Sequence, residues 1–282
     1  MEHLLLVDSN YLCYRAYRTT GGLSHQGKLT GVAFGFIRDI EILSELFEPS
    51  IVVFAFDAGG PGKRSEISSV YKSSRQEMTE EEREEKRQFY DQVHRLRSQI
   101  LPDLGYKNVI WRKGYEADDI IAKIAEDLRT DQEATMISAD GDLFQCLSDR
   151  VSFYNPHSKK ITTAKKFREQ WGLAPSMWAS VKALAGCGTD DVEGIRGVGE
   201  VTAAKWFNGK LKPDSKGYKL ISENLEVFNK NIDLVKLPFP GLELPELVPD
   251  DTNLAKLMKV KADLGIKAKR TRVPGGFDLE SQ

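Results

Sequence analysis

The sequence predicts an α/β protein with a mostly parallel central sheet flanked by helices, followed by a helical C-terminal region. In the first half of the chain, short apolar runs alternate with amphipathic stretches, which is the pattern of parallel strands joined by crossover helices. From about residue 164 these runs stop, and apolar residues recur at helical spacing. We therefore expect an α/β core over residues 1–163 and a helical region over residues 164–282.

Each predicted element of the core follows from a local pattern. Continuous apolar runs typical of buried parallel strands lie at 4–7, 51–56, 109–111, 134–139 and 151–154. Apolar residues at helical spacing predict helices at 31–46, 88–100 and 119–128, and a short helix at 142–147. After the second strand, a glycine-rich break at 59–62 opens a mostly polar insertion, in which residues 79–82 resemble the capped start of a helix.

The C-terminal region contains four predicted helices, at 164–171, 176–185, 200–207 and 220–235. The glycine-punctuated loop at 186–199 ends in a G-x-G turn formed by Gly197, Val198 and Gly199. Such a turn exposes backbone N–H groups at a helix N-terminus, where they can grip a phosphate without reading a base, and Lys205 can add a charge. The competing interpretation is that these glycines only cap a helix.

Acidic residues stand at the ends of the predicted strands. Asp8, Asp57 and Asp140 each follow an apolar run, and the carboxyl ends of parallel strands meet at one edge of a sheet. The other acids of this set open the helix near residue 119 or follow Asp140, and they are Glu116, Asp118, Asp119 and Asp142. So many like charges cannot share a pocket unpaired, and oxygen-only ligands favour Mg²⁺ or Mn²⁺. The sequence therefore predicts one acidic, metal-binding pocket.

Composition excludes several classes of protein. Lys and Arg number 40 against 42 Asp and Glu, which is not the basic balance of a protein that binds nucleic acid by bulk charge. The three cysteines have no paired spacing, which argues against a disulfide framework or a zinc knuckle and for a reducing compartment. No apolar run reaches membrane-spanning length and the sequence opens without a signal peptide, so we expect a cytoplasmic protein that contacts no membrane.

Taken in order, these motifs resemble the 5′-nuclease (flap endonuclease) superfamily. The matching elements are Asp8, Asp57, the E-A-D-D run at 116–119, the S-A-D-G-D run at 138–142, and Asp190 followed by the turn at 197–199. The similarity covers roughly residues 1–240 and is greatest to bacteriophage and bacterial 5′→3′ exonucleases, including the nuclease domain of bacterial DNA polymerase I. It implies a PIN-like core with a helical arch at about 63–95 and a helix-turn-helix variant at about 176–207.

The resemblance also implies a chemistry. Members of the superfamily hydrolyse phosphodiester bonds near the 5′ ends of branched or nicked DNA, and often of RNA in hybrids, with two divalent ions. By resemblance, the first ion would be surrounded by Asp8, Asp57, Glu116 and Asp118, and the second would be faced by Asp140, Asp142 and Asp190. Asp119 is placed with these metal-site acids, although a structural role fits it equally well because it points roughly 100° away from Asp118 on the helix. K⁺ at the helix-turn-helix is a further expected ion.

The sequence departs from the superfamily at one metal-site position. Where phage members carry two aspartates three apart, this chain has Cys187 and Asp190. A neutral thiol is a poor ligand for a hard cation, so we expect a weaker second metal site in an enzyme that remains active. A buried packing role is the alternative for Cys187.

The polar insertion carries the residues expected to act on the phosphate. By resemblance, Lys72 and Arg75 would be catalytic, because they would stabilise charge developing on the scissile phosphate. Tyr71 would stack on the terminal base, and Arg64 would join it as a DNA contact. A charged, solvated helix is the alternative for this stretch. In the helix-turn-helix, the expected DNA contacts are Gly197, Val198, Gly199, Thr202 and Lys205.

These inferences lead to a structure-specific 5′ nuclease, a 5′→3′ exonuclease or flap endonuclease that acts as a monomer on 5′-ended, nicked or branched DNA or on RNA–DNA hybrids. A structure-specific DNA-binding protein with weakened cleavage is the first alternative, and Cys187 favours it. A ribonuclease of the PIN class would lack the insertion and the helix-turn-helix. A phosphotransferase that uses Asp140 and Asp142 would leave the other acids idle.

Overall fold

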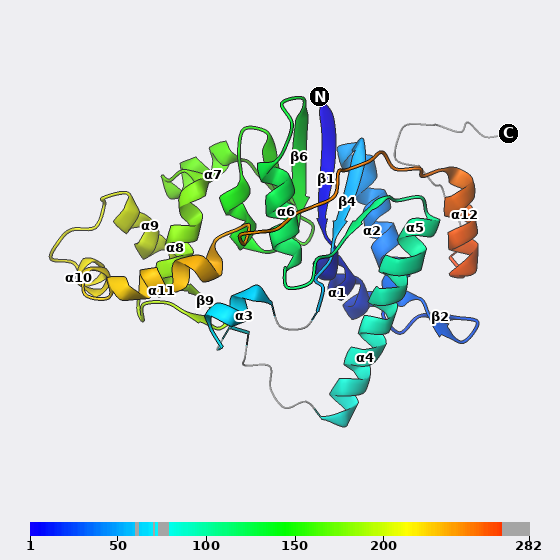
Figure 1. Ribbon diagram of the computed structural model, residues 1–282, viewed down its shortest axis with the longest axis horizontal. Helices are drawn as coiled ribbons and strands as arrows, with labels where there is room; N and C mark the ends of the chain where they lie inside the picture. Colours follow the sequence, from blue (N-terminus) through cyan, green and yellow to red (C-terminus); the bar gives the residue numbers. More distant parts are fainter. Residues whose placement is uncertain (60–61, 70, 73–78, 267–282) are drawn as a thin grey trace.

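A six-stranded sheet forms the centre of the molecule (Figure 1). The computed structural model describes residues 1–59, 62–69, 71–72 and 79–266. The strands lie in the order β5 (Asn108–Ile110), β4 (Ile51–Ala55), β1 (Glu2–Asp8), β6 (Gln132–Ile137), β7 (Val151–Asn155) and β8 (Lys160–Thr162). All neighbours are parallel except β7 and β8, which are antiparallel. The predicted fold class, a mostly parallel sheet flanked by helices, is therefore confirmed.

The apolar runs form the middle of this sheet. Leu4, Leu5, Leu6 and Val7 are fully buried in β1. Val7 is in register with Phe54 of β4 on one side and with Ile137 of β6 on the other. The segments that follow these three strands must therefore emerge at the same edge of the sheet.

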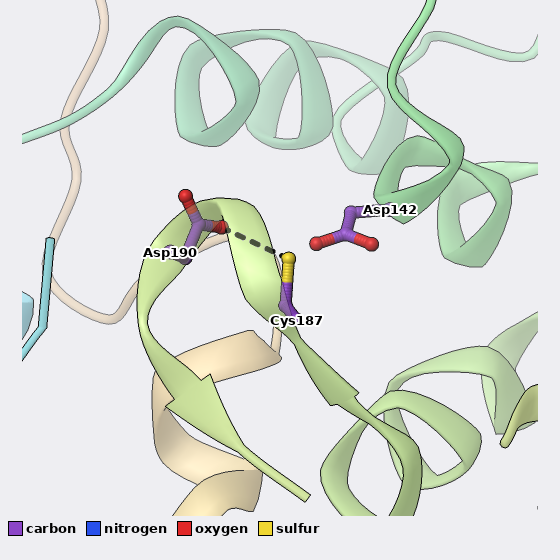
Figure 2. Close-up of side chains that lie close together, drawn as sticks. All are labelled: Asp142, Cys187 and Asp190. Carbon is purple, nitrogen blue, oxygen red and sulfur yellow. Dashed lines mark hydrogen bonds between the residues drawn. The ribbon is translucent and has the colours of Figure 1, made fainter. Parts of the chain in front are cut away.

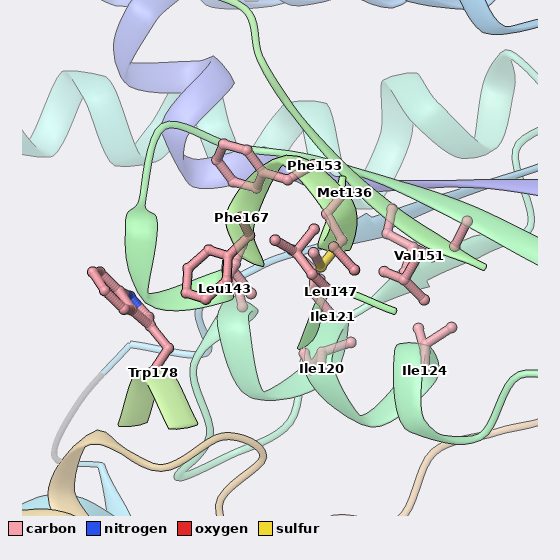
Figure 3. Packing of buried hydrophobic residues seen from close by; sticks show 14 of the residues in the cluster. Ile120, Ile121, Ile124, Met136, Leu143, Leu147, Val151, Phe153, Phe167 and Trp178 are labelled. Carbon is pink, nitrogen blue, oxygen red and sulfur yellow. The ribbon is translucent and has the colours of Figure 1, made fainter. Parts of the chain in front are cut away.

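The two faces of the sheet are covered by different helices. Because successive side chains of a strand point to opposite faces, Leu5 and Val7 pack against α1 (Ser9–Thr20), α2 (Gly31–Phe47) and α12 (Leu254–Asp263). Leu4 and Leu6 pack against α6 (Ala117–Glu126), the 3₁₀ helix η2 (Gly141–Cys146) and α8 (Trp178–Ala185). Figure 3 shows part of this second core, which includes Ile120 and Ile121 of α6 and Met136 of β6.

The polar insertion begins and ends in helices. The short helix α3 (Lys63–Ile67) precedes the undescribed residues, and α4 (Glu80–Arg95) follows them. Thr79 and Glu82 form the capping box that the sequence predicted at the start of α4. The helix then continues through a π-helical turn, η1 (Leu96–Ile100), into α5 (Leu101–Asp103). The helix predicted at 88–100 therefore begins earlier, at Glu80, and its last five predicted residues form a π-helical turn.

The second half of the chain is helical, as expected. Its elements are α7 (Ala164–Trp171), η3 (Pro175–Met177), α8, β9 (Gly186–Cys187), η4 (Gly188–Asp190), β10 (Val192–Glu193), α9 (Glu200–Phe207), α10 (Lys216–Ser222), α11 (Leu225–Val235) and α12. The prediction of one helix over 220–235 is wrong, because the chain breaks between α10 and α11 around Asn224, the residue that precedes α11. None of the helices in the described ranges is both long and apolar enough to cross a bilayer.

Several elements were not predicted. They include the helices α1, α3 and α12, the edge strand β8, the pair β9–β10, and a small hairpin of β2 (Ser24–His25) and β3 (Lys28–Leu29). Helix α12 lies far from the other C-terminal helices and packs on the first half of the chain (Figure 1). The division at residue 163 remains a prediction. Helix α12 lies beyond it in the sequence but contributes Leu257 and Val260 to the core of the first half.

Candidate active site

Carboxylates gather where β1, β4 and β6 end. Asp8 is the last residue of β1, and its Oδ1 accepts a hydrogen bond from the Tyr11 N–H at 3.0 Å while its Oδ2 accepts one from the Ser138 hydroxyl at 2.7 Å. Asp57, two residues past β4, accepts a bond from the Ala117 N–H at 2.8 Å. These bonds join the end of β1 to the residue after β6, and the end of β4 to the N-terminus of α6.

The charges of this cluster repel one another. Burial raises the pKa of Asp8 to about 7, with Asp57 and Asp140 adding to the effect and hydrogen bonds from Tyr11 and Ser138 opposing it. Burial and the neighbouring Asp142 raise the pKa of Asp140 to about 6. The pKa of Asp118 is raised by burial and then by Asp140, Asp8, Asp57 and Glu116. One cation shared by these carboxylates would offset both the cost of burying their charges and their mutual repulsion.

Two acids and a cysteine form a second cluster (Figure 2). Potential ligand atoms of Asp142, Cys187 and Asp190 all lie within 4.8 Å of one another. The Cys187 thiol lies 3.4 Å from Asp190 Oδ2 and 3.1 Å from the Thr189 hydroxyl. Burial raises the pKa of this thiol to about 12, so it is protonated and neutral at pH 7 without metal. The structure thus brings Cys187 to the position where the resemblance implies an aspartate ligand.

Two lysines supply positive charge to these clusters. Lys72 Nζ lies 2.7 Å from Glu116 Oε1 and 3.2 Å from Asp190 Oδ1. Lys182 Nζ lies 2.9 Å from Asp142 Oδ1 and 3.1 Å from Glu200 Oε1. Burial opposes the charged form of each lysine, but the adjacent carboxylates raise both pKa values. Both ammonium groups are therefore fixed in place by the acids that they neutralise.

Lys182 is a site residue that the sequence analysis missed. A signal for it exists, because Lys182 is the single charged residue of helix α8, whose other residues are apolar apart from Ser180. A charge on the buried side of such a helix is costly unless a residue of opposite charge pairs with it, and Asp142 is that partner. The two residues are 40 positions apart in the sequence, and only the packing of η2 on α8 brings them together.

Asp119 and Arg64 do not lie where the sequence analysis placed them. Asp119 is fully buried, and its two oxygens accept hydrogen bonds from Arg64 Nη1 at 2.7 Å and Nη2 at 2.8 Å. Arg64, 4% exposed, also donates its Nε–H to the Leu234 carbonyl at 2.9 Å. The pair holds α3 against α6 and the end of α11. Both groups are occupied within the protein, so this structure leaves Asp119 outside the metal cluster and Arg64 without a surface for DNA.

The structure places two of the other three residues expected to act on the substrate, Tyr71 and Lys72, but does not describe the third, Arg75. Tyr71 is 8% exposed and donates its hydroxyl to Glu116 Oε2 at 3.2 Å, so it supports a site carboxylate from within and presents no ring for stacking on a base. Lys72 is at the acidic clusters, as described above. Arg75, the second expected catalytic cation, lies outside the described residues.

The glycine turn precedes α9. Gly197 has φ +89°, a left-handed conformation that favours glycine, and Gly199 is the residue before the first turn of the helix. Both glycines are exposed, whereas Val198 is buried in the core and offers only its backbone to a partner. Lys205 is exposed and Thr202 is half-buried. The turn therefore presents an uncovered helix N-terminus to solvent, as a phosphate grip requires.

The donor set of the pocket fits hard divalent ions. Asp8 is buried and Asp118 and Asp140 are half-buried, and the pKa values of all three carboxyl groups are raised. A divalent cation would favour their ionised forms. The second cluster offers two carboxylates and one sulfur, a softer set that is less favourable to magnesium.

The chain belongs to the 5′-3′ exonuclease family. Residues 3–172 match the family model described as 5′-3′ exonuclease, N-terminal resolvase-like domain. The chain is similar to the 5′-3′ exonuclease of Bacillus subtilis (strain 168), with 31% identity over 211 residues, 72% of this chain and 68% of that protein. It is 31% identical over 270 residues to the thermostable DNA polymerase I of Thermus aquaticus, covering 94% of this chain but spanning only 29% of the polymerase.

Solved structures share the fold. A structure of the T5 5′-exonuclease with bound zinc matches with a TM-score of 0.70 and 22% identity, over 84% of this chain and 90% of that one. Human GEN1 in complex with Holliday junction DNA matches with a TM-score of 0.62 and 16% identity, over 94% of this chain and 68% of that one. The likeness covers both the sheet and the C-terminal helices.

Proposed function

We propose that this protein is a divalent-metal-dependent 5′ nuclease that hydrolyses phosphodiester bonds near the 5′ ends of nicked or branched DNA, and of RNA in hybrids. The observation that carries the proposal is the group of buried and half-buried carboxylates that gather where β1, β4 and β6 end, close enough to raise one another's pKa values. Repulsion and burial make such a group of negative charges destabilising to the fold unless bound cations neutralise it. Family membership and the exposed helix N-terminus at Gly199 support a nucleic-acid substrate.

The proposed roles follow from the positions of the residues. The first metal would be held by Asp8, Asp57, Glu116 and Asp118, and the second by Asp140, Asp142 and Asp190. Divalent ions in such a site activate a water and neutralise charge on the leaving oxygen. Hydrogen bonds from Tyr11, Ser138 and the Ala117 N–H orient the carboxylates before metal arrives.

Two further parts of the chain would handle the substrate. Lys72 is held between Glu116 and Asp190, and it becomes available to the scissile phosphate once cations take over those carboxylates. The backbone of the turn at Gly197–Gly199 would hold a phosphate of the duplex without reading its sequence. The K⁺ expected at the helix-turn-helix remains part of this proposal.

The test replaces a strand-end carboxylate. Asp57→Ala and Asp140→Ala should abolish cleavage of a 5′-labelled flap or nicked duplex in Mg²⁺, and leave its Kd in Ca²⁺ near that of the wild type. Asp149→Ala is the matched control, because Asp149 is an exposed acid outside the clusters. Cleavage by Asp140→Ala at the wild-type rate would show that the metal assignment is wrong.

A DNA-binding protein with weak cleavage is the second candidate. Cys187 at the second cluster and the ion pair of Lys182 with Asp142 favour it, because both reduce the anionic charge available to a second metal. A magnesium titration of cleavage by the wild type separates the two. Tight duplex binding without any cleavage in saturating Mg²⁺ or Mn²⁺ would favour the binding protein.

A further inference from the structure

One turn of the long helix after the insertion departs from α-helical geometry. The helix that begins at Glu80 changes to a π-helical turn at Leu96–Ile100 before it continues as α5. A π-turn accommodates an extra residue, is rare, and occurs frequently at functional sites. Arg97 lies in this turn.

The guanidinium group of Arg97 is held by aromatic rings. Its Cζ lies 4.3 Å from the centroid of the Trp111 ring and 6.0 Å from that of Phe56. Phe56 is fully buried, whereas Trp111 is 41% exposed. Two rings thus fix the position of the cation, as in sites where arginine serves recognition.

Within the described part of the chain, no acid pairs with Arg97. Its Nε atom is buried and has no hydrogen-bond partner among these residues. Burial without a neutralising carboxylate also lowers the pKa of this arginine. An unsatisfied buried donor on a charged group is costly. Arg97 as a whole is half-buried, so an anion that binds its accessible terminal nitrogens would offset part of the cost of this unpaired charge.

Arg97 borders a cavity that reaches the proposed active site. The cavity has a volume of about 660 Å³ and is lined by Asp57 and Glu116 on one side. On the α4 side it is lined by Lys86, Tyr90, His94 and Arg97, which recur at helical spacing along one face of the helix. This volume falls within the range of about 300–1,000 Å³ that is usual for ligand sites.

We infer that Arg97 binds a phosphate group of the substrate strand on the 5′ side of the scissile bond, and so sets which 5′ ends the protein accepts. The inference rests on the proposed function and names one more residue for it. A planar guanidinium offers paired N–H donors that match a phosphate. The carboxylates at the other side of the cavity would hold cations for the scissile phosphate, whereas Arg97 offers its charge to a different phosphate of the same strand.

The phosphate can be a terminal 5′-phosphate or an internal phosphodiester of a flap, and the substrates in the test separate these sources. Binding is measured by fluorescence anisotropy in Ca²⁺, on a nicked duplex with a 5′-phosphate, the same duplex with a 5′-hydroxyl, and a duplex with a 5′ flap. Arg97→Gln should raise the Kd of at least one phosphate-bearing substrate by about tenfold or more, because a charge-assisted hydrogen bond is lost. Arg97→Lys should give a smaller increase in Kd, because lysine keeps the positive charge but lacks the paired N–H donors of the guanidinium.

The pattern of loss identifies the source of the phosphate. A terminal phosphate is bound if the wild type prefers the 5′-phosphorylated nick and Arg97→Gln removes that preference. An internal phosphate is bound if the loss is confined to the flap. Arg38→Gln is the matched control and should leave all three Kd values unchanged, because Arg38 also contacts a ring, Phe34 at 5.9 Å, but does not line the cavity.

A purely structural role for Arg97 makes a different prediction. Arg97→Met should melt at or above the wild-type temperature if the arginine is kept for binding, since an unpaired buried donor is removed. A lower melting temperature of Arg97→Met together with wild-type Kd values for Arg97→Gln and Arg97→Lys would overturn the inference, as would unchanged Kd values alone. These binding measurements do not require cleavage. Weakened binding by Arg97→Gln in a protein that fails to cleave would support the inference while the nuclease proposal fails.

Discussion

The ion pair between Arg64 and Asp119 predicts that two neighbouring aspartates respond in opposite ways to the same substitution. The Asp119 carboxylate accepts hydrogen bonds from Nη1 and Nη2 of Arg64, and a third from the Phe239 N–H at 2.8 Å. Asp119→Asn keeps the size of the side chain, so no cavity forms. It removes the negative charge and turns an NH₂ group towards a guanidinium that cannot be deprotonated.

The size of the effect follows from burial. Arg64 and Asp119 are 4% and 0% exposed, so the cation left behind has no access to water. Removing one partner of a buried ion pair costs about 3–5 kcal/mol. At roughly 2–4 °C per kcal/mol for a chain of this size class, the melting temperature should fall by about 10 °C.

The assay compares Asp119→Asn with Asp118→Asn by thermal unfolding without metal, followed by cleavage in Mg²⁺. Burial and four neighbouring carboxylates raise the pKa of Asp118, so neutralising it should leave the metal-free melting temperature unchanged or higher. Asp118→Asn should then lose cleavage, whereas Asp119→Asn should still cleave below its own melting temperature. A wild-type melting temperature for Asp119→Asn, combined with loss of cleavage, would refute the structural role and return Asp119 to the metal site.

Three further predictions concern the acidic clusters and the phosphate grip. The pKa of Asp8 rises from 3.8 to about 7 on folding, so the metal-free folded state keeps a proton that the unfolded chain releases. The free energy of unfolding should therefore fall as pH rises from about 4 to 7. In a series of thermal melts, saturating Mg²⁺ should abolish this decline. Cys187→Asp supplies a hard oxygen beside Asp190, so half-maximal cleavage should need less Mg²⁺ while the metal-free melting temperature drops; an unchanged titration would place Cys187 outside the second site. Gly199→Ala meets no atom within 4 Å, so it should fold normally and weaken binding to duplexes of any sequence alike; equal Kd values for the variant and the wild type would exclude this turn as the grip.

Local patterns in the sequence predicted most of the regular structure. The helices at 164–171 and 200–207 have the bounds that their apolar spacing indicated. The parallel strands follow from runs such as residues 4–7, because a strand buried on both faces has to be apolar throughout. Helix α1 was missed because its buried stripe is made largely of small residues, Ser9, Cys13 and Ala16, beside Leu12, and so gives little hydrophobic contrast.

The gathering of acids could also be predicted from the sequence, since Asp8, Asp57 and Asp140 follow strands that the parallel topology aligns. The partners of those acids could not. Arg64 meets Asp119 across 55 residues of sequence, and Lys182 meets Asp142 across 40. The resemblance alone suggested a DNA contact for Arg64 and a place among the metal-site acids for Asp119.

The amino-acid sequence by itself determined the class of fold, the strand ends that carry the acids and the departure at Cys187, because each depends on residues close together in the chain. Tertiary structure alone decided which charges are neutralised within the protein and which remain for a ligand. Arg64 is buried in an ion pair, whereas Arg97 lies between rings beside a cavity with its Nε unsatisfied among the described residues. The physical reason is that the cost of a buried charge depends on its partners, and those partners come from distant segments that meet only when the sheet and its helices pack.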